Sequence, residues 1–379
     1  MQKNDGMAKR IECEHGIVCR LAGERLGYFG WPTVARLDDG TLVVASSGLR
    51  SEHVCPWGKT VLNVSRDDGR TWSPPRVIND SPLDDRDAGV VNLGGGKLLV
   101  TWFRSDNRKY ANDEGFRKWL GDEELASWRP TLDALTDDVV NRHLGSWIML
   151  SGDGGETWSH PLQSPVSTPH GPIRLRCGDL LYLGKSYRLG WNDMEVGSIF
   201  AACSTDGGRS WAILGAVPFY DRTKGANYHE PHVVELPSGK LIGMIRVENG
   251  GGVDLDKDAG VVNFSIMQTE SADGGRTWSV PKPLNFHGSP PHLLRGLSGT
   301  LIMTYGYRMP PFGQRAAFSR DDGSTWDHDW IIRDDGPDGD LGYPSTVELA
   351  DGNLFTVCYQ KVPGDRKCSL LWSRWKLPE

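Results

Sequence analysis

The chain has 379 residues, among them 47 glycines and 15 tryptophans, and its formal net charge is −7. An acidic chain is repelled by nucleic acid and by anionic membranes, and no apolar run is long enough to span a bilayer, so we expect neither as a partner. Abundant glycine favours many short strands joined by tight turns.

The seven cysteines are scattered along the chain and form no Cys-x-x-Cys pair. This pattern favours free thiols, and we expect neither a metal nor another cofactor. The basic residues near the N-terminus are not followed by the apolar segment of a signal peptide. We therefore expect a cytoplasmic protein, or a secreted one whose leader has been removed.

Six segments share one pattern, in which an apolar strand runs into a glycine turn and a second apolar strand runs back. They begin at Thr33, Ala88, Gly171, Pro231, Pro291 and Pro344, and their turn glycines are Gly40, Gly96, Gly178, Gly239, Gly299 and Gly352. Between 105 and 146, apolar residues recur instead at three- and four-residue steps, which predicts a helical insertion.

A second motif, Ser-x-Asp-x-Gly-x-(Thr/Ser)-Trp, follows five of the six hairpins, beginning at Ser65, Ser151, Ser204, Ser271 and Ser319. Its aspartate can accept hydrogen bonds from nearby backbone amides, and its glycine supplies a positive φ. The tryptophan is expected to pack on the neighbouring sheet. Five equivalent carboxylates cannot all be catalytic, so we interpret this Asp box as a structural turn.

Six hairpins, each followed by two further strands, predict an all-β six-bladed propeller. We expect one domain over residues 1–379, with the helical insertion in the second blade. The last repeat has no Asp box, and we expect an N-terminal strand near Gly16–Leu21 to complete it and close the ring.

This topology places the glycine turns and Asp boxes on one face, and gathers first-strand starts and second-strand ends on the other. The strand starts supply Trp31, Asp87, His170, Glu230, His292 and Tyr343, and the strand ends supply Arg50, Arg104, Arg188, Arg246, Arg308 and Lys361. A cation in every blade predicts a basic funnel for an anionic group, with two or three of the six facing the ligand.

The Asp boxes and hairpins resemble the sialidase (neuraminidase) superfamily over nearly the whole chain. The segment from Glu230 to Arg246 is similar to the sialidase strand that carries the catalytic glutamate and a carboxylate-binding arginine. Tyr343 matches the nucleophilic tyrosine and Arg308 matches another arginine of the substrate-binding triad. Asp87 resembles an aspartate that lines the sialidase pocket.

The sequence departs from this pattern at two positions of the first blade. Where sialidases carry Arg-Ile-Pro, this chain has Gly30-Trp31-Pro32, so one arginine of the triad is missing. Arg50 matches an arginine that follows the first hairpin, but the acid/base aspartate expected shortly after it is absent. Three residues are candidates for that role, namely Asp87, Glu52 and His53.

The resemblance implies an exo-acting glycoside hydrolase that releases a terminal acidic sugar, either sialic acid or a related sugar such as a uronic acid, from a glycan. The implied catalytic residues are Tyr343, Glu230 and Asp87, and the implied substrate-binding residues are Arg50, Arg246 and Arg308. Trp31 and His170, which the topology places at the same end of the axis, are further candidates for substrate binding. A non-catalytic carbohydrate-binding propeller of the same fold is the alternative, because the usual acid is missing.

Overall fold

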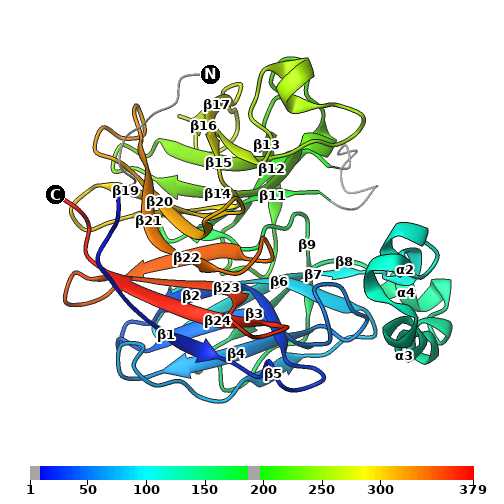
Figure 1. Cartoon of the computed structure of the whole chain (residues 1–379). Coiled ribbons are helices and arrows are strands. Elements are labelled where there is room, and N and C mark those ends of the chain that lie inside the picture. Colours follow the sequence, from blue (N-terminus) through cyan, green and yellow to red (C-terminus); the bar gives the residue numbers. More distant parts are fainter. Residues whose placement is uncertain (1–8, 187–196) are drawn as a thin grey trace.

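The structure is a computed structural model that describes residues 9–186 and 197–379. In these residues, 24 strands form six four-stranded antiparallel sheets, arranged as the blades of a propeller (Figure 1). The predicted fold class is therefore confirmed.

The first three blades are continuous in the chain. Blade 1 contains β2 (Tyr28–Arg36), β3 (Leu42–Arg50), β4 (Lys59–Ser65) and β5 (Arg76–Asn79). Blade 2 contains β6 (Asp84–Gly94), β7 (Lys97–Ser105), β8 (Gly145–Ser151) and β9 (Leu162–Ser164). Blade 3 contains β10 (Ile173–Arg174), β11 (Leu180–Lys185), β12 (Ile199–Ser204) and β13 (Ala212–Ala216).

Two further blades are also continuous, and the last one joins both ends of the chain. Blade 4 contains β14 (Tyr228–Glu235), β15 (Leu241–Val247), β16 (Ser265–Ser271) and β17 (Lys282–His287). Blade 5 contains β18 (Pro291–Arg295), β19 (Leu301–Tyr307), β20 (Phe312–Ser319) and β21 (Asp327–Gly336). Blade 6 contains β22 (Gly342–Glu348), β23 (Leu354–Lys361), β24 (Cys368–Trp375) and β1 (Cys13–Cys19).

The N-terminal strand closes the ring, as expected, although it begins a few residues earlier than predicted. β1 pairs with β24 from Cys13 opposite Trp375 onward, and the two strands lie side by side in blue and red in Figure 1. An Asp box connects the third and fourth strands of a blade. In blade 6 these strands come from opposite ends of the chain, so no turn joins them, which explains why this repeat has no Asp box.

The Asp boxes have the predicted structural role, as the first one shows. Asp67 accepts hydrogen bonds from the backbone amide of Thr71 at 2.9 Å and from its hydroxyl at 2.6 Å, while Ser65 donates to Asp67 at 2.8 Å. Gly69 has a φ of 83°, and the Trp72 ring lies 6.1 Å from Phe355 in blade 6. The six hairpin-turn glycines likewise have φ values between 73° and 97°.

The helical insertion lies between β7 and β8 and projects from the side of the propeller (Figure 1). It contains α1 (Arg108–Ala111), α2 (Glu114–Leu120), α3 (Asp122–Asp133) and α4 (Asp137–His143). Its buried Trp128 packs in one apolar cluster with Val54 and Cys55 from the loop after β3. The insertion is therefore anchored on that loop. Among the described residues, no helix is long and apolar enough to cross a bilayer.

Three histidines from neighbouring blades meet at the centre of the ring. The His232 ring stacks on His292 at 4.5 Å, and His170 lies edge-on to both rings, at 5.6 and 5.0 Å. Burial lowers the pKa of His232 to about 3 and the pKa values of the other two well below their ordinary range. These rings are therefore neutral and form an uncharged plug on the axis.

Because the three histidines are buried in the neutral form, we expect the free energy of unfolding to fall in mild acid. An unfolded histidine takes up a proton near pH ~6.5, whereas folded His232 does so only near pH 3, so protons favour the unfolded chain between these values. The contribution of His232 then falls by roughly 1.4 kcal/mol per pH unit below about 6.5. In urea unfolding between pH 5 and 8, His232→Gln is expected to have a shallower pH dependence than the wild type. Exposed His160→Gln should not change the slope, and equal slopes for all three proteins would contradict the assignment.

Candidate active site

Four inner strands begin with the same backbone irregularity. Trp31, Asp87, Glu230 and Tyr343 have φ values of 52°, 54°, 46° and 51°, in the left-handed region. At each of them the inner strand holds one residue more than the strand it pairs with. Such a bulge breaks the alternation of side chains and re-aims one of them. The four side chains are thereby directed into a common space on the axis.

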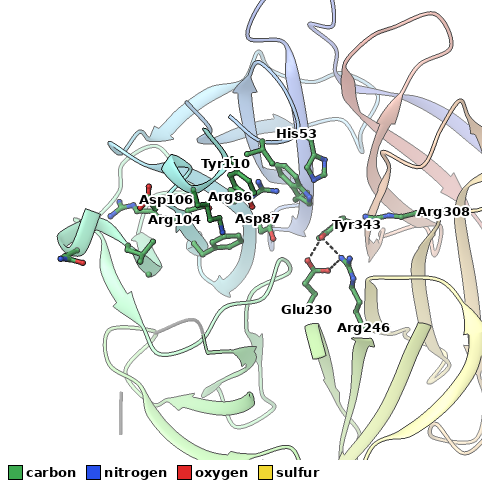
Figure 2. A pocket seen from close by; sticks show the side chains of 18 residues that line it. His53, Arg86, Asp87, Arg104, Asp106, Tyr110, Glu230, Arg246, Arg308 and Tyr343 are labelled. Atoms are coloured by element: carbon green, nitrogen blue, oxygen red, sulfur yellow. Dashed lines mark hydrogen bonds and ion pairs between the residues drawn. The ribbon is translucent and has the colours of Figure 1, made fainter. Parts of the chain in front are cut away.

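That space is a cavity of about 1040 Å³ on the face predicted from the topology. Six of the eight residues expected at the site line it, namely Trp31, Asp87, Glu230, Arg246, Arg308 and Tyr343 (Figure 2). The insertion and its flanks extend one wall with Asp106, Lys109, Tyr110, Asn141 and Leu144. The tryptophans of the insertion, Trp119 and Trp128, are not among the lining residues.

A tyrosine, a glutamate and an arginine form a closed hydrogen-bonded triangle in this cavity. The Tyr343 hydroxyl donates to Glu230 Oε1 at 2.5 Å, and Arg246 donates to Glu230 Oε2 at 2.6 Å and to the Tyr343 oxygen at 3.1 Å (Figure 2). Glu248 holds the other end of the Arg246 guanidinium at 2.5 Å. The geometry gives the tyrosine proton a direct path to a carboxylate.

The triangle also fixes the charges of its members. Burial raises the pKa of Glu230, but the Arg246 charge and the Tyr343 hydrogen bond outweigh burial and leave this pKa below its ordinary value. Burial, together with the nearby Glu230 charge, raises the pKa of Tyr343 well above its ordinary value. The resting pair is therefore a carboxylate beside a neutral phenol.

Asp87 lies next to this pair with a different protonation behaviour. Burial raises its pKa to about 7, the Arg86 charge opposes this shift, and the Glu230 charge adds to it. One oxygen, Oδ1, is buried without a hydrogen-bond partner among the described residues. Asp87 can therefore carry a proton near neutral pH.

Arg308 is the cavity-lining arginine best placed to bind an anion. Its Nε donates to the Leu341 carbonyl at 3.0 Å, and its guanidinium lies 5.8 Å from the Tyr343 ring. None of the described carboxylates forms an ion pair with it, whereas the other lining arginines, Arg86, Arg104 and Arg246, all have acidic partners. Its terminal nitrogens are thus free to bind an anionic substrate group.

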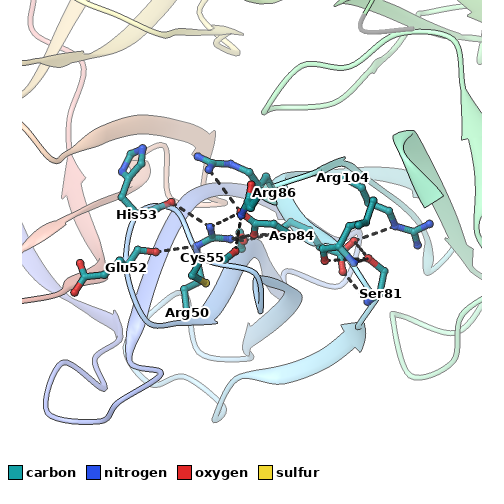
Figure 3. Close-up of polar contacts among 12 residues, drawn as sticks. Arg50, Glu52, His53, Cys55, Ser81, Asp84, Arg86 and Arg104 are labelled. Carbon is teal, nitrogen blue, oxygen red and sulfur yellow. Dashed lines mark hydrogen bonds and ion pairs between the residues drawn. The ribbon is translucent and has the colours of Figure 1, made fainter. Parts of the chain in front are cut away.

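Two expected site residues do not line the cavity. Arg50 is completely buried, because its guanidinium is held in a bidentate pair by buried Asp84 at 2.6 and 2.8 Å (Figure 3). His170 belongs to the histidine plug and bonds to the Thr33 hydroxyl at 3.1 Å. Both therefore support the site from beneath and have no access to a ligand in the cavity.

Other expectations from the sequence are only partly met. Of the six recurring cations, Arg104, Arg246 and Arg308 line the cavity, Lys361 pairs with Asp338, and Arg188 lies outside the described residues.

Trp31 lines the cavity but is only 1% exposed, and the Arg86 and Arg50 guanidinium groups lie 4.4 and 4.9 Å from its ring centre. Its ring thus packs against the guanidinium groups of two arginines that pair with Asp84. Glu52 is not a lining residue.

Several lining residues were missed from the sequence. Arg86 precedes Asp87 and in a regular strand would point the other way, but the bulge brings both side chains to the cavity. The adjacent Arg-Asp pair beside a predicted strand start was the available signal. The contributions of Lys109, Tyr110 and Asn141 depend on how the insertion folds, and no sequence motif indicates them.

The sequence model of the BNR repeat-like domain family matches residues 129–356, which is more than half of the chain. This protein belongs to the BNR repeat-like domain family. A sialidase of Micromonospora viridifaciens is 23% identical over 365 residues, covering 88% of this chain and 50% of that protein. The chain thus spans about half the length of this curated relative. The resemblance to sialidases expected from the sequence is confirmed.

Solved structures share the fold of this BNR repeat-like protein at low sequence identity. A Dyadobacter fermentans protein of unknown function has a TM-score of 0.72 and 21% identity, with 96% of this chain and 98% of that chain covered. The intramolecular trans-sialidase of Ruminococcus gnavus gives 0.62 and 15%, with 96% and 97% covered. The Trypanosoma rangeli sialidase bound to the inhibitor DANA gives 0.60 and 18%, with 97% and 58% covered.

The buried Arg50–Asp84 pair generates a stability prediction. Asp84 also accepts a hydrogen bond from Asn107, where the insertion begins, at 3.0 Å. Asp84→Ala leaves a buried guanidinium unpaired and is expected to cost roughly 3–5 kcal/mol of unfolding free energy. Asp80→Ala removes the exposed partner of Lys59 and should cost about 1 kcal/mol or less. Denaturant unfolding compares the two variants, and similar losses would show that the pair does not brace the site.

Proposed function

We propose that this protein is an exo-acting glycoside hydrolase of sialidase type, which releases a terminal acidic sugar from a glycan. The observation that carries the proposal is the 2.5 Å hydrogen bond from the Tyr343 hydroxyl to Glu230 inside the axial cavity. A phenol is a poor nucleophile at neutral pH unless a base takes its proton. A buried tyrosine already bonded to a buried carboxylate meets this requirement.

The proposed reaction has two displacements. In the first, the Tyr343 oxygen attacks the anomeric carbon, its proton passes to Glu230, and the bond to the leaving oxygen breaks as an acid protonates that oxygen. In the second, water attacks the same carbon and gives a proton to the conjugate base of that acid, while the tyrosine oxygen leaves and takes its proton back from Glu230. Arg246 holds Glu230 Oε2 and the tyrosine oxygen throughout, which stabilises negative charge on either atom.

The charges of the site support an acidic sugar as the substrate. Arg308 has a guanidinium with no carboxylate partner among the described residues, and a planar fork of this kind binds carboxylates in a bidentate way. A neutral tyrosine also approaches a carboxylate-bearing anomeric centre without the repulsion that an anionic nucleophile would meet. The relatives named as sialidases make a sialic acid the first sugar to test.

A carbohydrate-binding propeller without catalysis remains the second candidate. It is favoured by the first blade, where Gly30 stands in place of an arginine and no aspartate follows shortly after Arg50. The two functions differ in turnover, since the binding protein would retain the sugar conjugate intact.

The nucleophile assignment predicts the effects of two conservative substitutions. Glu230→Gln keeps a hydrogen bond but cannot accept the proton, so kcat for an aryl α-sialoside is expected to fall by roughly 10²–10⁴-fold. Tyr343→Phe should be comparably damaging, and the double variant little worse than either single one, because the pair acts as a unit. Near-normal turnover in either single variant, with wild-type melting temperature, would refute the assignment.

The anion assignment predicts that shape matters as much as charge at position 308. Arg308→Ala should weaken binding of a carboxylate-bearing sugar by roughly 2–5 kcal/mol, and Arg308→Lys should be nearly as harmful because lysine cannot form the bidentate contact. Isothermal titration with N-acetylneuraminic acid measures the loss, and its methyl ester is the matched neutral ligand. Equal losses for the acid and the ester would place the carboxylate elsewhere.

A further inference from the structure

A histidine outside the Tyr343–Glu230–Arg246 triangle stands at the cavity with the contacts of a proton donor. His53 lies in the loop between β3 and β4, lines the cavity, and has a side chain that is 36% exposed. Its ring lies edge-on to Trp31 at 4.9 Å, and Trp31 is also edge-on to Tyr343 at 6.4 Å. His53 and the proposed nucleophile therefore both border the Trp31 indole, and both are labelled in Figure 2.

The backbone of the His53 loop is fixed from within the protein. Arg50 donates from Nε to the Glu52 carbonyl at 3.3 Å and from Nη2 to the His53 carbonyl at 3.1 Å, while Nη1 and Nη2 bind Asp84 (Figure 3). Asn107 donates to the Cys55 carbonyl at 2.9 Å. The burial of Arg50, unexpected for a ligand-binding residue, thus places His53.

The imidazole itself is oriented by a buried acid. His53 Nδ1 lies 2.9 Å from Asp340 Oδ1, which also accepts a hydrogen bond from the Tyr28 hydroxyl at 2.9 Å. Burial raises the pKa of Asp340, but the contacts from His53 and Tyr28 outweigh it and bring this pKa to about 2, so Asp340 is ionised. An ionised acid at Nδ1 keeps the proton on that nitrogen. Burial lowers the pKa of His53 below its ordinary value even though Asp340 raises it, so the imidazolium that donates from Nε2 forms in mild acid. None of the described residues bonds to Nε2.

We propose that His53, oriented by Asp340, is the acid/base residue of this site. The inference rests on the proposed glycosidase function and supplies its missing proton donor. As Tyr343 attacks the anomeric carbon, the His53 Nε2 proton moves to the leaving glycosidic oxygen while the bond between that oxygen and the carbon breaks. In the second step, neutral Nε2 takes a proton from the attacking water, which restores the imidazolium.

Position distinguishes His53 from Asp87, the candidate that can carry a proton near neutral pH. Asp87 is only 6% exposed, and like Glu230 and Tyr343 it is a left-handed residue at the start of an inner strand, which groups it with the nucleophile. A leaving-group acid has to stand where the aglycone departs toward open space. The half-exposed His53 ring fulfils this condition, and Asp340 acts through it as a positioning residue.

Leaving-group dependence tests the proposal. 4-Methylumbelliferyl α-N-acetylneuraminide releases a stable phenolate without acid help, whereas sialyllactose releases a sugar alkoxide that needs a proton. For His53→Gln, kcat/KM on sialyllactose is expected to fall by roughly 10²–10⁴-fold, and on the aryl sialoside by less than about tenfold. For Asp340→Asn, kcat/KM on sialyllactose should also fall more than kcat/KM on the aryl sialoside, although the difference should be smaller. Loss of a merely structural residue would lower both rates alike.

The controls separate the possible failures. His328→Gln removes a histidine that likewise pairs with an aspartate, Asp329 at 2.8 Å, outside the cavity, and should leave both rates unchanged. Retained aryl-sialoside cleavage by His53→Gln shows that the fold and nucleophile are intact. Equal losses on both substrates would overturn the role of His53, and a selective loss in Asp87→Asn alone would transfer it to Asp87. If the wild type cleaved neither probe, the proposed function would fail and the inference with it.

Discussion

The site depends on one backbone constraint, the left-handed residue that begins four of the inner strands. Each such residue costs of the order of 1–3 kcal/mol, because a side chain is unfavourable at positive φ. The apolar clusters between neighbouring blades hold the strands rigidly enough to maintain this conformation, and each bulge turns one side chain to the axis. A repeated fold thereby presents four different residues, Trp31, Asp87, Glu230 and Tyr343, at equivalent places around one cavity.

The ionisation states of the acidic residues in the cavity are set by their burial and by the charges next to them. Glu230 stays ionised because Arg246 lies against it, Tyr343 holds its proton, and Asp87 can carry a proton near neutral pH. Arg308 alone among the lining arginines has no carboxylate partner in the described residues. The site is thus prepared for one further negative charge, which accords with an acidic sugar.

The first blade differs from the pattern suggested by sialidases in a coordinated way. Gly30 stands where an arginine was expected, and the ring of the next residue, Trp31, borders Arg86, Arg50 and His53. Arg50 turns inward to Asp84 and fixes the loop that carries His53. These changes form one connected group, which supports an altered catalytic site in this blade over the loss of one.

The repeats allowed much of the fold to be predicted from the sequence, because a hairpin glycine and an Asp box constrain the backbone locally. The same topology brought Glu230 and Tyr343 together, since both begin inner strands. Arg50 could not be placed in this way, because its direction depends on Asp84, which is distant in sequence and carries no motif. The partnership of His53 with Asp340 likewise joins the first blade to the last and becomes visible only in three dimensions.

The most direct test of the central claim is to trap the covalent intermediate. Incubation with the 3-fluoro glycosyl fluoride of N-acetylneuraminic acid provides a good leaving group at the anomeric carbon and slows the second displacement. Peptide mapping by mass spectrometry is expected to find the glycosyl adduct on Tyr343, and no adduct in Tyr343→Phe. An adduct on another residue, or turnover of the aryl sialoside with no adduct on Tyr343, would contradict the account.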